Sequence, residues 1–238
     1  MQMIRVQNLA ADCGTASRVP VPAPPALARM LPDVPVGGMA KRVLDIVLVL
    51  AGILLLLPLI LGLMILLKLT NPGPLLYGHR RIGFGGREFL CWKFRTMVVD
   101  GDAVLERHLR ENPADAVIWN EQRKLVNDPR VTPVGAVLRK LSLDELPQLL
   151  NVLKGEMSLV GPRPVVQDEL DHYAGSARHY LAARPGLSGL WQISGRSDTT
   201  YAERVRLDRF YVTNWSLWRD LRIIFLTIPA VALSRGAH

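Results

Sequence analysis

Cysteine is scarce in this 238-residue sequence, which contains only Cys13 and Cys91. The two cysteines have no CxxC spacing and no histidine cluster nearby, so neither a disulfide framework nor a zinc site is supported. The order of parts in a secretory signal peptide is also absent, because the long apolar run begins only after Lys41 and Arg42. We therefore expect no cleaved leader, and we expect the part of the chain that carries chemistry to face a reducing cytosol.

The chain is short for two large domains, so we expect one domain with appendages. Its 29 Lys and Arg residues exceed its 21 Asp and Glu residues, which gives a formal net charge of +8. This excess indicates an anionic partner, such as a phosphate group, a lipid headgroup or nucleic acid, and charge alone does not choose among them. The sequence has no recognised nucleic-acid readout motif, so we expect no nucleic-acid partner.

Residues 1–38 combine prolines with alanines and have no sustained apolar period, which predicts a flexible tail outside the fold. The segment from Ile46 to Leu67 then has 22 consecutive residues without a charge. At ~1.5 Å per residue it covers roughly 33 Å, about the hydrocarbon thickness of a bilayer. A buried helix of a soluble protein rarely stays apolar on every face for that length, so residues 39–70 are predicted to enter a membrane.

Two features favour a helix that re-enters the membrane and returns to the same side. Pro58 lies near the middle of the segment, where it removes one backbone hydrogen bond and bends the helix. Basic residues flank both ends, with Lys41 and Arg42 before it and Lys68 after it, so both flanks are expected on the cytosolic side. A kinked spanning helix stays open as the alternative, because transmembrane helices tolerate proline.

Residues 71–238 are predicted to form a compact α/β head that is mainly helical. Two strand-like runs, 75–82 and 87–97, flank a glycine-rich connection and predict a small β-hairpin. Helical patterns follow over residues 102–112, 114–125, 133–141, 143–153, 168–183 and 201–212. Residues 217–233 join an apolar band to basic edges, which is typical of an amphipathic helix at a membrane interface.

Cationic side chains supply the first candidates for a phosphate site. A strand period of two over residues 89–97 puts Lys93 and Arg95 together on one face. The other face carries Leu90, Trp92 and Phe94 and is predicted to be the apolar one. Several guanidinium groups held in place by a rigid backbone would suit the binding of a diphosphate. Each cation taken alone also fits an ordinary solvated surface residue. Further arginines occur at turns and helix starts that fix the backbone, namely Arg139, Arg163, Arg184 and Arg196.

Two interpretations of the adjacent carboxylates Asp144 and Glu145 stay open on residue patterns alone. Ser142 with Glu145 three residues later forms a capping-box pattern, and acidic residues in a first helical turn are favoured by the helix dipole. The same dipole stabilises an ionised carboxylate, so Asp144 is also a candidate nucleophile. Glu145 is then a candidate ligand for Mg²⁺, which binds carboxylate and substrate phosphate oxygens together.

Several long blocks, in a fixed order from about Lys41 to Arg235, resemble the monotopic phosphoglycosyl transferases, the bacterial polyprenyl-phosphate sugar-1-phosphate transferases. The chain is most similar to the short priming transferases of succinoglycan-like exopolysaccharide synthesis, which use galactose 1-phosphate. The chain departs from the family at Leu57, since many relatives have a serine directly before the membrane proline. A serine hydroxyl could bond the backbone carbonyl that Pro58 leaves without a partner, so the sharpness of the helix bend at Pro58 stays open. The matching blocks are residues 41–45, 93–97, 128–132, 143–164 and 184–196, and the narrower likeness rests on residues 77–86 and 227–231.

The resemblance implies an enzyme that transfers hexose 1-phosphate from UDP-galactose or UDP-glucose to polyprenyl (undecaprenyl) phosphate. Asp144 would attack the sugar-proximal phosphorus, release UMP and form an aspartyl-phosphosugar intermediate, while Glu145 would bind the Mg²⁺ cofactor. The resemblance also implies a bacterial inner-membrane protein in contact with lipid, with its head facing the cytoplasm. Phosphate charge would be neutralised by Lys93 and Arg95 in catalysis, and the substrate would be bound by Arg139, Arg163, Pro164, Arg184 and Arg196.

A non-catalytic, membrane-attached adaptor of an exopolysaccharide assembly is the alternative hypothesis. It is disfavoured because an adaptor has no reason to assemble Asp144 and Glu145 among several turn-borne arginines. The choice between galactose and glucose, the length of the lipid chain, and the formation of a homodimer stay open at this point.

Overall fold

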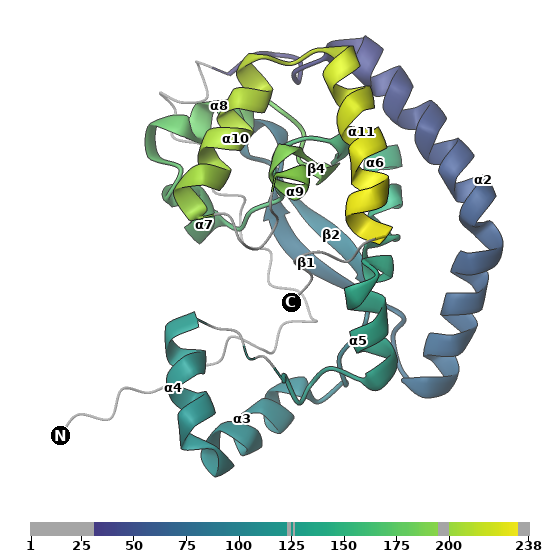
Figure 1. Ribbon diagram of the computed structural model, residues 1–238, viewed down its shortest axis with the longest axis vertical. Coiled ribbons are helices and arrows are strands. Elements are labelled where there is room, and N and C mark those ends of the chain that lie inside the picture. Colours follow the sequence, from purple (N-terminus) through teal and green to yellow (C-terminus); the bar gives the residue numbers. More distant parts are fainter. Residues whose placement is uncertain (1–30, 123–124, 126, 195–199, 233–238) are drawn as a thin grey trace. The chain divides into compact units, whose positions relative to one another are not determined.

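The computed structural model describes residues 31–122, 125, 127–194 and 200–232. The chain divides into two units, a small one that contains Asp100–Arg130 and a larger one that contains the described residues before and after it. Helices predominate, and the β structure of the described residues consists of two small two-stranded sheets in the larger unit (Figure 1). The predicted mainly helical architecture with a small β part is therefore confirmed.

The longest element is helix α2, Gly38–Thr70, which has 33 residues and contains Pro58. In Figure 1 it curves around the rest of the larger unit. Lys41 and Asp45 are buried near its first end, and Leu63 and Leu67 are buried near its second end. Both ends of α2 therefore pack on the same unit, and the helix bounds agree with the predicted segment 39–70.

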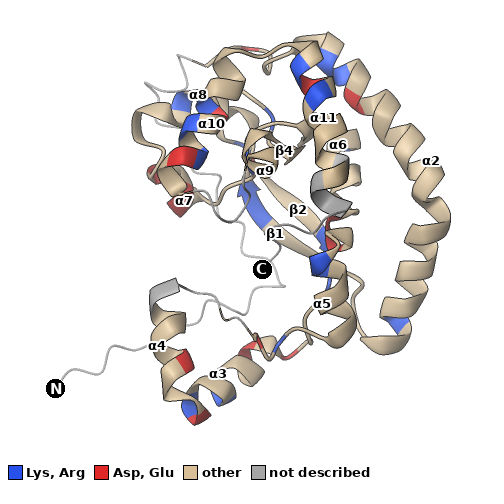
Figure 2. Cartoon of the chain, viewed as in Figure 1, with Lys and Arg blue, Asp and Glu red and all other residues tan. Residues whose placement is uncertain are grey.

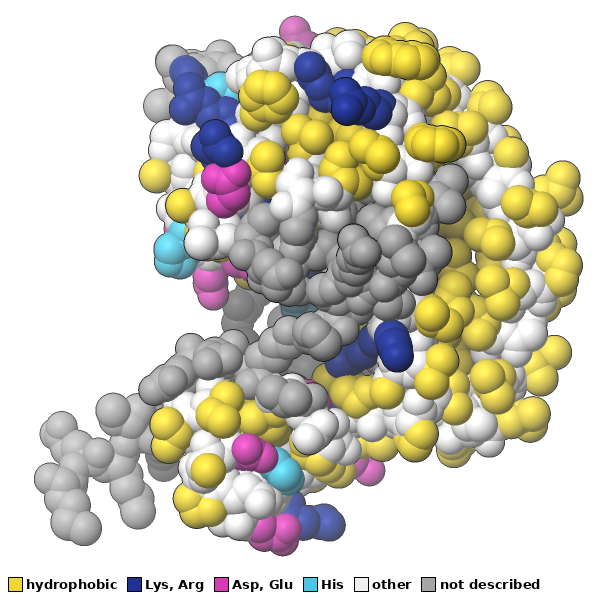
Figure 3. Space-filling view, in the orientation of Figure 1, with side chains coloured by type: hydrophobic (Ala, Val, Ile, Leu, Met, Phe, Trp, Pro, Cys, Tyr) yellow, Lys and Arg dark blue, Asp and Glu magenta, His cyan; other side chains and the backbone are white. Residues whose placement is uncertain are grey.

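The middle of α2 presents apolar side chains to the outside. Leu54, Leu55 and Ile65 are 76%, 80% and 63% exposed, and only 11% of the most apolar 18-residue window is buried. Charged residues stand at the two ends of the helix and not between them (Figure 2), and hydrophobic side chains follow its outer side (Figure 3). A soluble core helix would be mostly buried, so this helix has the length and surface of one that enters a membrane.

Buried polar contacts fix the first turns of α2, and we call Lys41, Asp220 and Tyr211 the α2 latch. Lys41 Nζ lies 2.6 Å from Asp220 Oδ2, and the two side chains are 6% and 1% exposed. The Tyr211 hydroxyl donates to Asp220 Oδ1 at 2.7 Å. Asp220 belongs to helix α11, Leu217–Ala232, and Tyr211 to helix α10, Tyr201–Thr213, so the latch joins α2 to these two helices.

The predicted hairpin is confirmed as strands β1, Leu76–Ile82, and β2, Glu88–Phe94, which pair antiparallel. The connection contains the 3₁₀ turn η1, Phe84–Gly86, and Gly85 has a φ of +69°, a left-handed conformation that favours glycine. Tyr77 lies opposite Lys93 and His79 lies opposite Cys91, so these four side chains share one face of the hairpin.

The buried face of β2 differs from the predicted apolar face. Phe89 and Cys91, on the same face as Lys93, are 8% and 3% exposed, whereas Leu90 is 41% exposed. Helix α6, Gln148–Lys154, causes this difference because its apolar side chains pack against Phe89 and Cys91. Phe94 is buried as predicted, against the second end of α2.

A parallel pair of strands, β3, Ser158–Val160, and β4, Gly186–Ser188, is not predicted from the sequence. Each has three residues, which is too short for a period of two to be recognised. The segments next to these two strands approach each other closely, since a Cβ on Gly161 would lie 2.4 Å from the Arg184 carbonyl oxygen. Only glycine fits that position without a shift of the backbone.

The helix predicted over residues 168–183 is interrupted in the structure. Ala174 has a φ of +44°, a left-handed conformation that a helix cannot contain. The segment consists of helix α7, Gln167–Asp171, the 3₁₀ turn η3, Ala174–Ser176, and helix α8, Ala177–Leu181. Helix α9, Leu190–Ile193, follows β4 and precedes α10 and α11.

Helix α5, Pro133–Lys140, begins as its sequence predicts. Thr132 accepts a hydrogen bond from the Gly135 backbone N–H at 3.0 Å, and the missing N–H of proline at the first position costs nothing there. The helix predicted from Leu143 instead begins at Gln148 as α6, after the 3₁₀ turn η2, Leu143–Glu145.

The small unit contains helices α3, Gly101–Glu111, and α4, Pro113–Gln122, near the predicted positions. Arg130 pairs with Asp128 at 2.6 Å and lies over the Trp119 ring, 4.9 Å from its centroid. Both contacts join residues of the small unit.

Candidate active site

Asp144 and Glu145, which we call the dyad, lie on the 3₁₀ turn η2. The preceding Ser142 has a φ of +55°, its side chain makes no capping hydrogen bond, and no α-helix begins at Leu143. The capping-box interpretation is therefore wrong. Asp144 is only 7% exposed. Burial of a carboxylate is costly, and helix capping does not explain why this one is buried.

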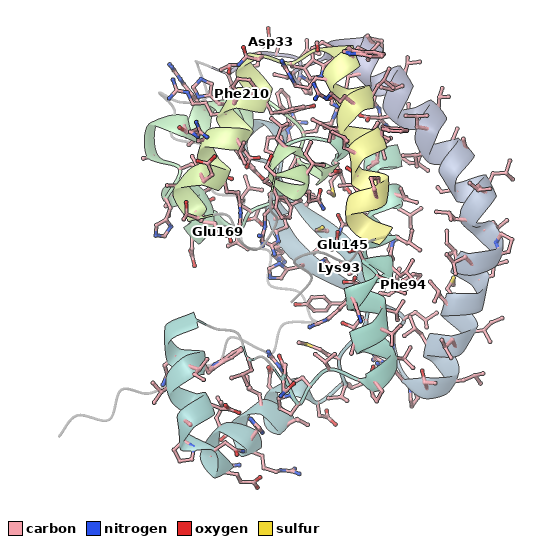
Figure 4. All side chains as sticks on the ribbon, in the orientation of Figure 1. Asp33, Lys93, Phe94, Glu145, Glu169 and Phe210 are labelled. Atoms are coloured by element: carbon pink, nitrogen blue, oxygen red, sulfur yellow. The ribbon has the colours of Figure 1, made fainter. Side chains whose placement is uncertain are left out.

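Lys93 of β2 contacts both carboxylates of the dyad. Its Nζ lies 2.5 Å from Glu145 Oε1 and 3.7 Å from Asp144 Oδ2, and Figure 4 places Lys93 next to Glu145. Burial lowers the pKa of Lys93, but Glu145 and Asp144 together outweigh it and raise that pKa above its ordinary value. Lys93 therefore stays protonated as a fixed cation beside the dyad.

Asp144 is held between opposing electrostatic effects. Burial raises its pKa above the ordinary value, the charge of Lys93 opposes this rise, and Glu145 adds to it. Arg139 of α5 also lowers the pKa of Asp144, and its Nε donates to Thr96 Oγ1 at 2.7 Å. A poorly solvated carboxylate with two cations near it has the environment of a nucleophile that reacts as an anion.

Arg95 is not joined to the dyad by any hydrogen bond or ion pair among the described residues. It follows β2, and its Nη2 donates to the carbonyl oxygens of Asn71 and Pro72 at 2.6 and 2.9 Å. The side chain therefore fixes the chain where it leaves α2. The prediction that Lys93 and Arg95 point at one place is wrong, because Lys93 contacts the dyad whereas Arg95 contacts the carbonyl oxygens at the end of α2.

The other predicted cations are distributed over the larger unit. Arg184 donates from Nε to the Gly155 carbonyl oxygen at 2.8 Å, which ties the end of α6 to the chain before β4. Arg163 lies over the Trp191 ring, 5.4 Å from its centroid, with Pro164 next to it in the chain. Arg196 lies outside the described residues. Of the predicted cations, Lys93 and Arg139 are the ones that the described structure brings to Asp144.

Lys93→Met is expected to raise the activation free energy of the transfer reaction that the family resemblance implies by roughly 2 to 4 kcal/mol, because one charge-assisted contact is lost. The acid limb of the kcat/KM profile should also move to higher pH. Lys93 lowers the pKa of Asp144, so without it the carboxylate ionises at a higher pH. Rate measurements on the wild type and the variant across the acidic range check both effects.

Arg95→Met is the matched control, because it removes a cation two positions away that bonds only backbone carbonyls in the described structure. Its acid limb should coincide with that of the wild type. An unshifted acid limb in Lys93→Met would contradict the electrostatic role assigned to Lys93.

Asn151 of α6 is a site residue that the sequence patterns miss. It is fully buried, its Nδ2 donates to the Leu90 carbonyl oxygen at 2.7 Å, and its Oδ1 accepts from the Trp92 backbone N–H at 3.0 Å. The Asn151 side-chain amide thus forms the two backbone hydrogen bonds that a neighbouring strand would form with β2. It thereby fixes β2, which carries Lys93, to helix α6, which follows the dyad. The detectable signal is a polar residue inside the apolar run of α6.

An apolar cavity of about 620 Å³ lies between α2 and the segment that follows the dyad. Leu57 and Met64 line it from α2, and Leu146 and Pro147 line it directly after Glu145. Among its described lining residues only Lys68 is charged. A cavity of this kind fits a hydrocarbon chain whose polar end reaches the dyad.

The dyad offers the oxygen donors that Mg²⁺ prefers. The Glu145 side chain is 30% exposed, which leaves it accessible from solvent. No group of three or more His, Cys, Asp or Glu side chains is arranged to hold a metal within the part of the chain that the structure describes. The dyad therefore fits a magnesium site in which phosphate oxygens of a substrate and water complete the ligand set.

The chain is similar to several bacterial proteins that act on sugars and lipid carriers. The profile described as "Bacterial sugar transferase" matches residues 36–234. The exopolysaccharide production protein ExoY of Rhizobium meliloti (strain 1021) is 60% identical over 204 residues, which cover 86% of this chain and 90% of that protein. The UDP-glucose:undecaprenyl-phosphate glucose-1-phosphate transferase of Caulobacter vibrioides is 43% identical, with 87% and 75% covered. The undecaprenyl-phosphate galactose phosphotransferase of Salmonella typhimurium is 49% identical, with 83% and 41% covered.

Proposed function

Because this chain belongs to the bacterial sugar transferase family, we propose that it transfers hexose 1-phosphate from a UDP-sugar to polyprenyl phosphate. Two relatives are named for transfer of galactose or glucose phosphate to undecaprenyl phosphate, and a third is named for exopolysaccharide production. The product is a lipid diphosphosugar that primes an exopolysaccharide repeat unit. UDP-galactose is the first choice of donor, and UDP-glucose is the second.

The observation that carries this proposal is the buried carboxylate of Asp144 with Lys93 Nζ at 3.7 Å and Arg139 nearby. A carboxylate that is poorly hydrated loses little solvation when it attacks. The two cations then face the negative charge that develops on a transferring phosphoryl group.

In the first step an Asp144 carboxylate oxygen attacks the sugar-proximal phosphorus of the UDP-sugar. The bond from this phosphorus to the bridging oxygen breaks, UMP leaves with the bonding electron pair, and an aspartyl-phosphosugar forms. Lys93, which donates to Glu145 at 2.5 Å, is close enough to neutralise charge on the phosphate oxygens.

In the second step a phosphate oxygen of the polyprenyl phosphate attacks the same phosphorus. The bond from phosphorus to the Asp144 oxygen breaks, which regenerates the carboxylate and leaves a polyprenyl diphosphosugar. The apolar cavity between α2 and Leu146 would hold the first part of the hydrocarbon chain. Its position supports a lipid acceptor that approaches the dyad from the membrane helix.

We assign Mg²⁺ to the dyad, where it would neutralise charge on the donor diphosphate. Glu145→Gln should lower turnover steeply and raise the Mg²⁺ concentration needed for half of the maximal rate, because a metal ligand is weakened while the Asp144 nucleophile remains. Titration of the rate with Mg²⁺ checks this expectation. The exposed Glu111→Gln is the control, and equal Mg²⁺ dependence in all three proteins would refute the assignment.

We also propose that α2 re-enters the membrane and that the catalytic unit faces the cytoplasm. Support comes from the two ends of α2, which pack on the same unit through Lys41 and through Leu67. Single cysteines placed near Gly38 and Thr70 in a variant without Cys13 and Cys91 should be labelled by an impermeant reagent from the same side of the membrane. Labelling from opposite sides would establish a spanning helix instead.

The transfer itself is tested with radiolabelled UDP-galactose and UDP-glucose, undecaprenyl phosphate and the full chain in lipid nanodiscs. An enzyme yields a labelled lipid in the organic phase and releases UMP. A membrane-attached adaptor yields neither product with either donor, and that outcome would overturn the proposal.

A further inference from the structure

The hairpin presents an exposed aromatic side chain beside the cation of the dyad. Tyr77 of β1 lies directly opposite Lys93 of β2, so the two side chains leave the same face of the hairpin at adjacent positions. On this face α6 packs against Phe89 and Cys91 of β2. Tyr77 is 55% exposed, so α6 covers β2 and leaves this position of β1 open.

A second ring supports the ring of Tyr77. The rings of Tyr77 and His79 stack, with their centroids 6.3 Å apart and their planes 24° apart. His79 Nδ1 is buried and has no hydrogen-bond partner among the described residues, so the ring contact is the interaction that the structure gives this side chain. We call Tyr77 and His79 the aromatic step.

The aromatic step carries no charge of its own at neutral pH. Burial lowers the pKa of His79 below its ordinary value, and the charges of Arg81 and Lys93 lower it further, whereas Glu169 raises it. The imidazole is therefore neutral, and it does not compete with Lys93 for phosphate oxygens. Two uncharged rings next to a cation suit the uncharged part of a substrate whose phosphate group lies at that cation.

The proposed reaction determines which part of the donor lies next to the aromatic step. Asp144 attacks the sugar-proximal phosphorus, and Lys93 Nζ lies 3.7 Å from Asp144 Oδ2. The hexose is joined to that phosphorus through a single oxygen atom, so it has to lie close to Lys93. The Cβ atoms of directly opposed residues in such a hairpin are about 4.5 to 5.5 Å apart, which places Tyr77 within reach of the hexose.

The apolar cavity lies on the opposite face of the hairpin. Leu76 and Phe94 line it, and in the β1–β2 register this pair points away from the face of Tyr77 and Lys93. A lipid acceptor in the cavity would therefore leave the aromatic step to the sugar donor.

We propose that the aromatic step is the platform for the hexose of the donor, with the Tyr77 ring stacked on the sugar and His79 holding that ring in place. This inference rests on the proposed transfer reaction. Galactose carries the hydrogens of C3, C4 and C5 on one side of its ring, and this apolar side packs on the electron-rich face of an aromatic ring. In glucose the C4 hydrogen points to the other side, which interrupts the apolar surface. Tyr77 therefore favours galactose over glucose.

The test measures binding of UDP-galactose, UDP-glucose and UMP by calorimetry, with Mg²⁺ present. The protein is the full chain in nanodiscs with Asp144→Asn, so that the donor is not consumed. Addition of Tyr77→Ala should weaken UDP-galactose binding about 3- to 10-fold and UDP-glucose binding less. UMP binding should stay unchanged, because UMP lacks the hexose. Arg80→Ala is the matched control on the same strand, since its side chain is 64% exposed and belongs to the opposite face.

Two conservative variants separate the ring from its polar atoms. Tyr77→Phe keeps the ring and should bind all three ligands like the parent protein. His79→Ala should lose part of the UDP-galactose affinity, but it should cause no further loss when Tyr77 is already alanine, because His79 acts through that ring. His79→Phe should restore the affinity, since it again places a ring beside Tyr77.

The outcomes distinguish the platform from the proposed transfer. Equal changes in UMP and UDP-galactose affinity in Tyr77→Ala, or no change in either, would overturn the platform, and equal losses for the two donors would overturn its preference for galactose. If the native chain yields no labelled lipid but Tyr77→Ala still separates UDP-galactose from UMP, the transfer fails and the platform stands. If transfer proceeds and Tyr77→Ala does not separate these ligands, only the platform is wrong.

Discussion

Asp144→Asn is expected to abolish lipid-linked product and UMP release together. An amide cannot form the acyl phosphate that the proposed mechanism requires, so neither half of the reaction proceeds. The fold should survive, because Asn has nearly the shape of Asp. The folded-state pKa of Asp144 is raised, so ionisation of the native carboxyl reduces stability as pH rises from the unfolded pKa through the folded one. Removal of that ionisation should leave the melting temperature at neutral pH equal or higher.

The measurement combines product assays with mass spectrometry. Wild-type protein quenched after mixing with UDP-sugar alone should carry a hexose-phosphate adduct on the peptide that contains Asp144, and the variant should carry none. Asp171→Asn, at an exposed position of α7, is the control and should retain the adduct. Full turnover by Asp144→Asn would refute the covalent mechanism, and a lower melting temperature would refute the electrostatic account of this carboxyl.

Lys41→Met is expected to cost about 3 to 5 kcal/mol of unfolding free energy, because it leaves the carboxylate of Asp220 buried without its counter-ion. The double variant Lys41→Met with Asp220→Asn should recover part of this loss. An asparagine oxygen still accepts from the Tyr211 hydroxyl, and the unpaired charge of Asp220 is removed. Recovery stays partial because buried Asp45 also loses the favourable charge of Lys41.

Chemical unfolding in detergent micelles measures both variants. Lys68→Met is the control at the other end of α2, where the lysine is exposed and, among the described residues, donates one hydrogen bond, to the Gly73 carbonyl oxygen at 3.3 Å. This change should alter stability by less than about 0.5 kcal/mol. A loss in Lys41→Met as small as in the control would show that the latch does not support the fold.

The elements with strong local signals could be predicted from the sequence. The apolar run around Pro58, the glycine turn before β2 and the start of α5 at Pro133 each depend on residues within a few positions, and each lies where expected. The interruption at Ala174 could not be predicted, because alanine favours a helix and only the surrounding packing holds it at positive φ. The short strands β3 and β4 depend on each other across the chain and have no pattern of their own.

The candidate site was predictable in its residues and not in its arrangement. In the local sequence, Asp144 and Glu145 fit both a helix cap and a catalytic site. The contact that distinguishes the two interpretations comes from Lys93, which is 52 positions away from Glu145. Arg184 has the same residue type as Arg139 and the same kind of setting, and Arg95 follows Lys93 in a strand-like run. Their hydrogen bonds to backbone carbonyls give them a structural role that no spacing rule distinguishes.

The latch has a consequence for the order of events during synthesis. Lys41 and Asp220 are 179 positions apart, and at ~5–20 residues per second a ribosome needs roughly 10 to 35 s to add the second after the first. During that interval α2 has emerged, and contact with lipid is the stabilisation open to it while the helix that carries Asp220 does not yet exist. If α2 enters a membrane as proposed, its insertion would therefore precede closure of the core, and α11, the last helix among the described residues, would complete the latch afterwards.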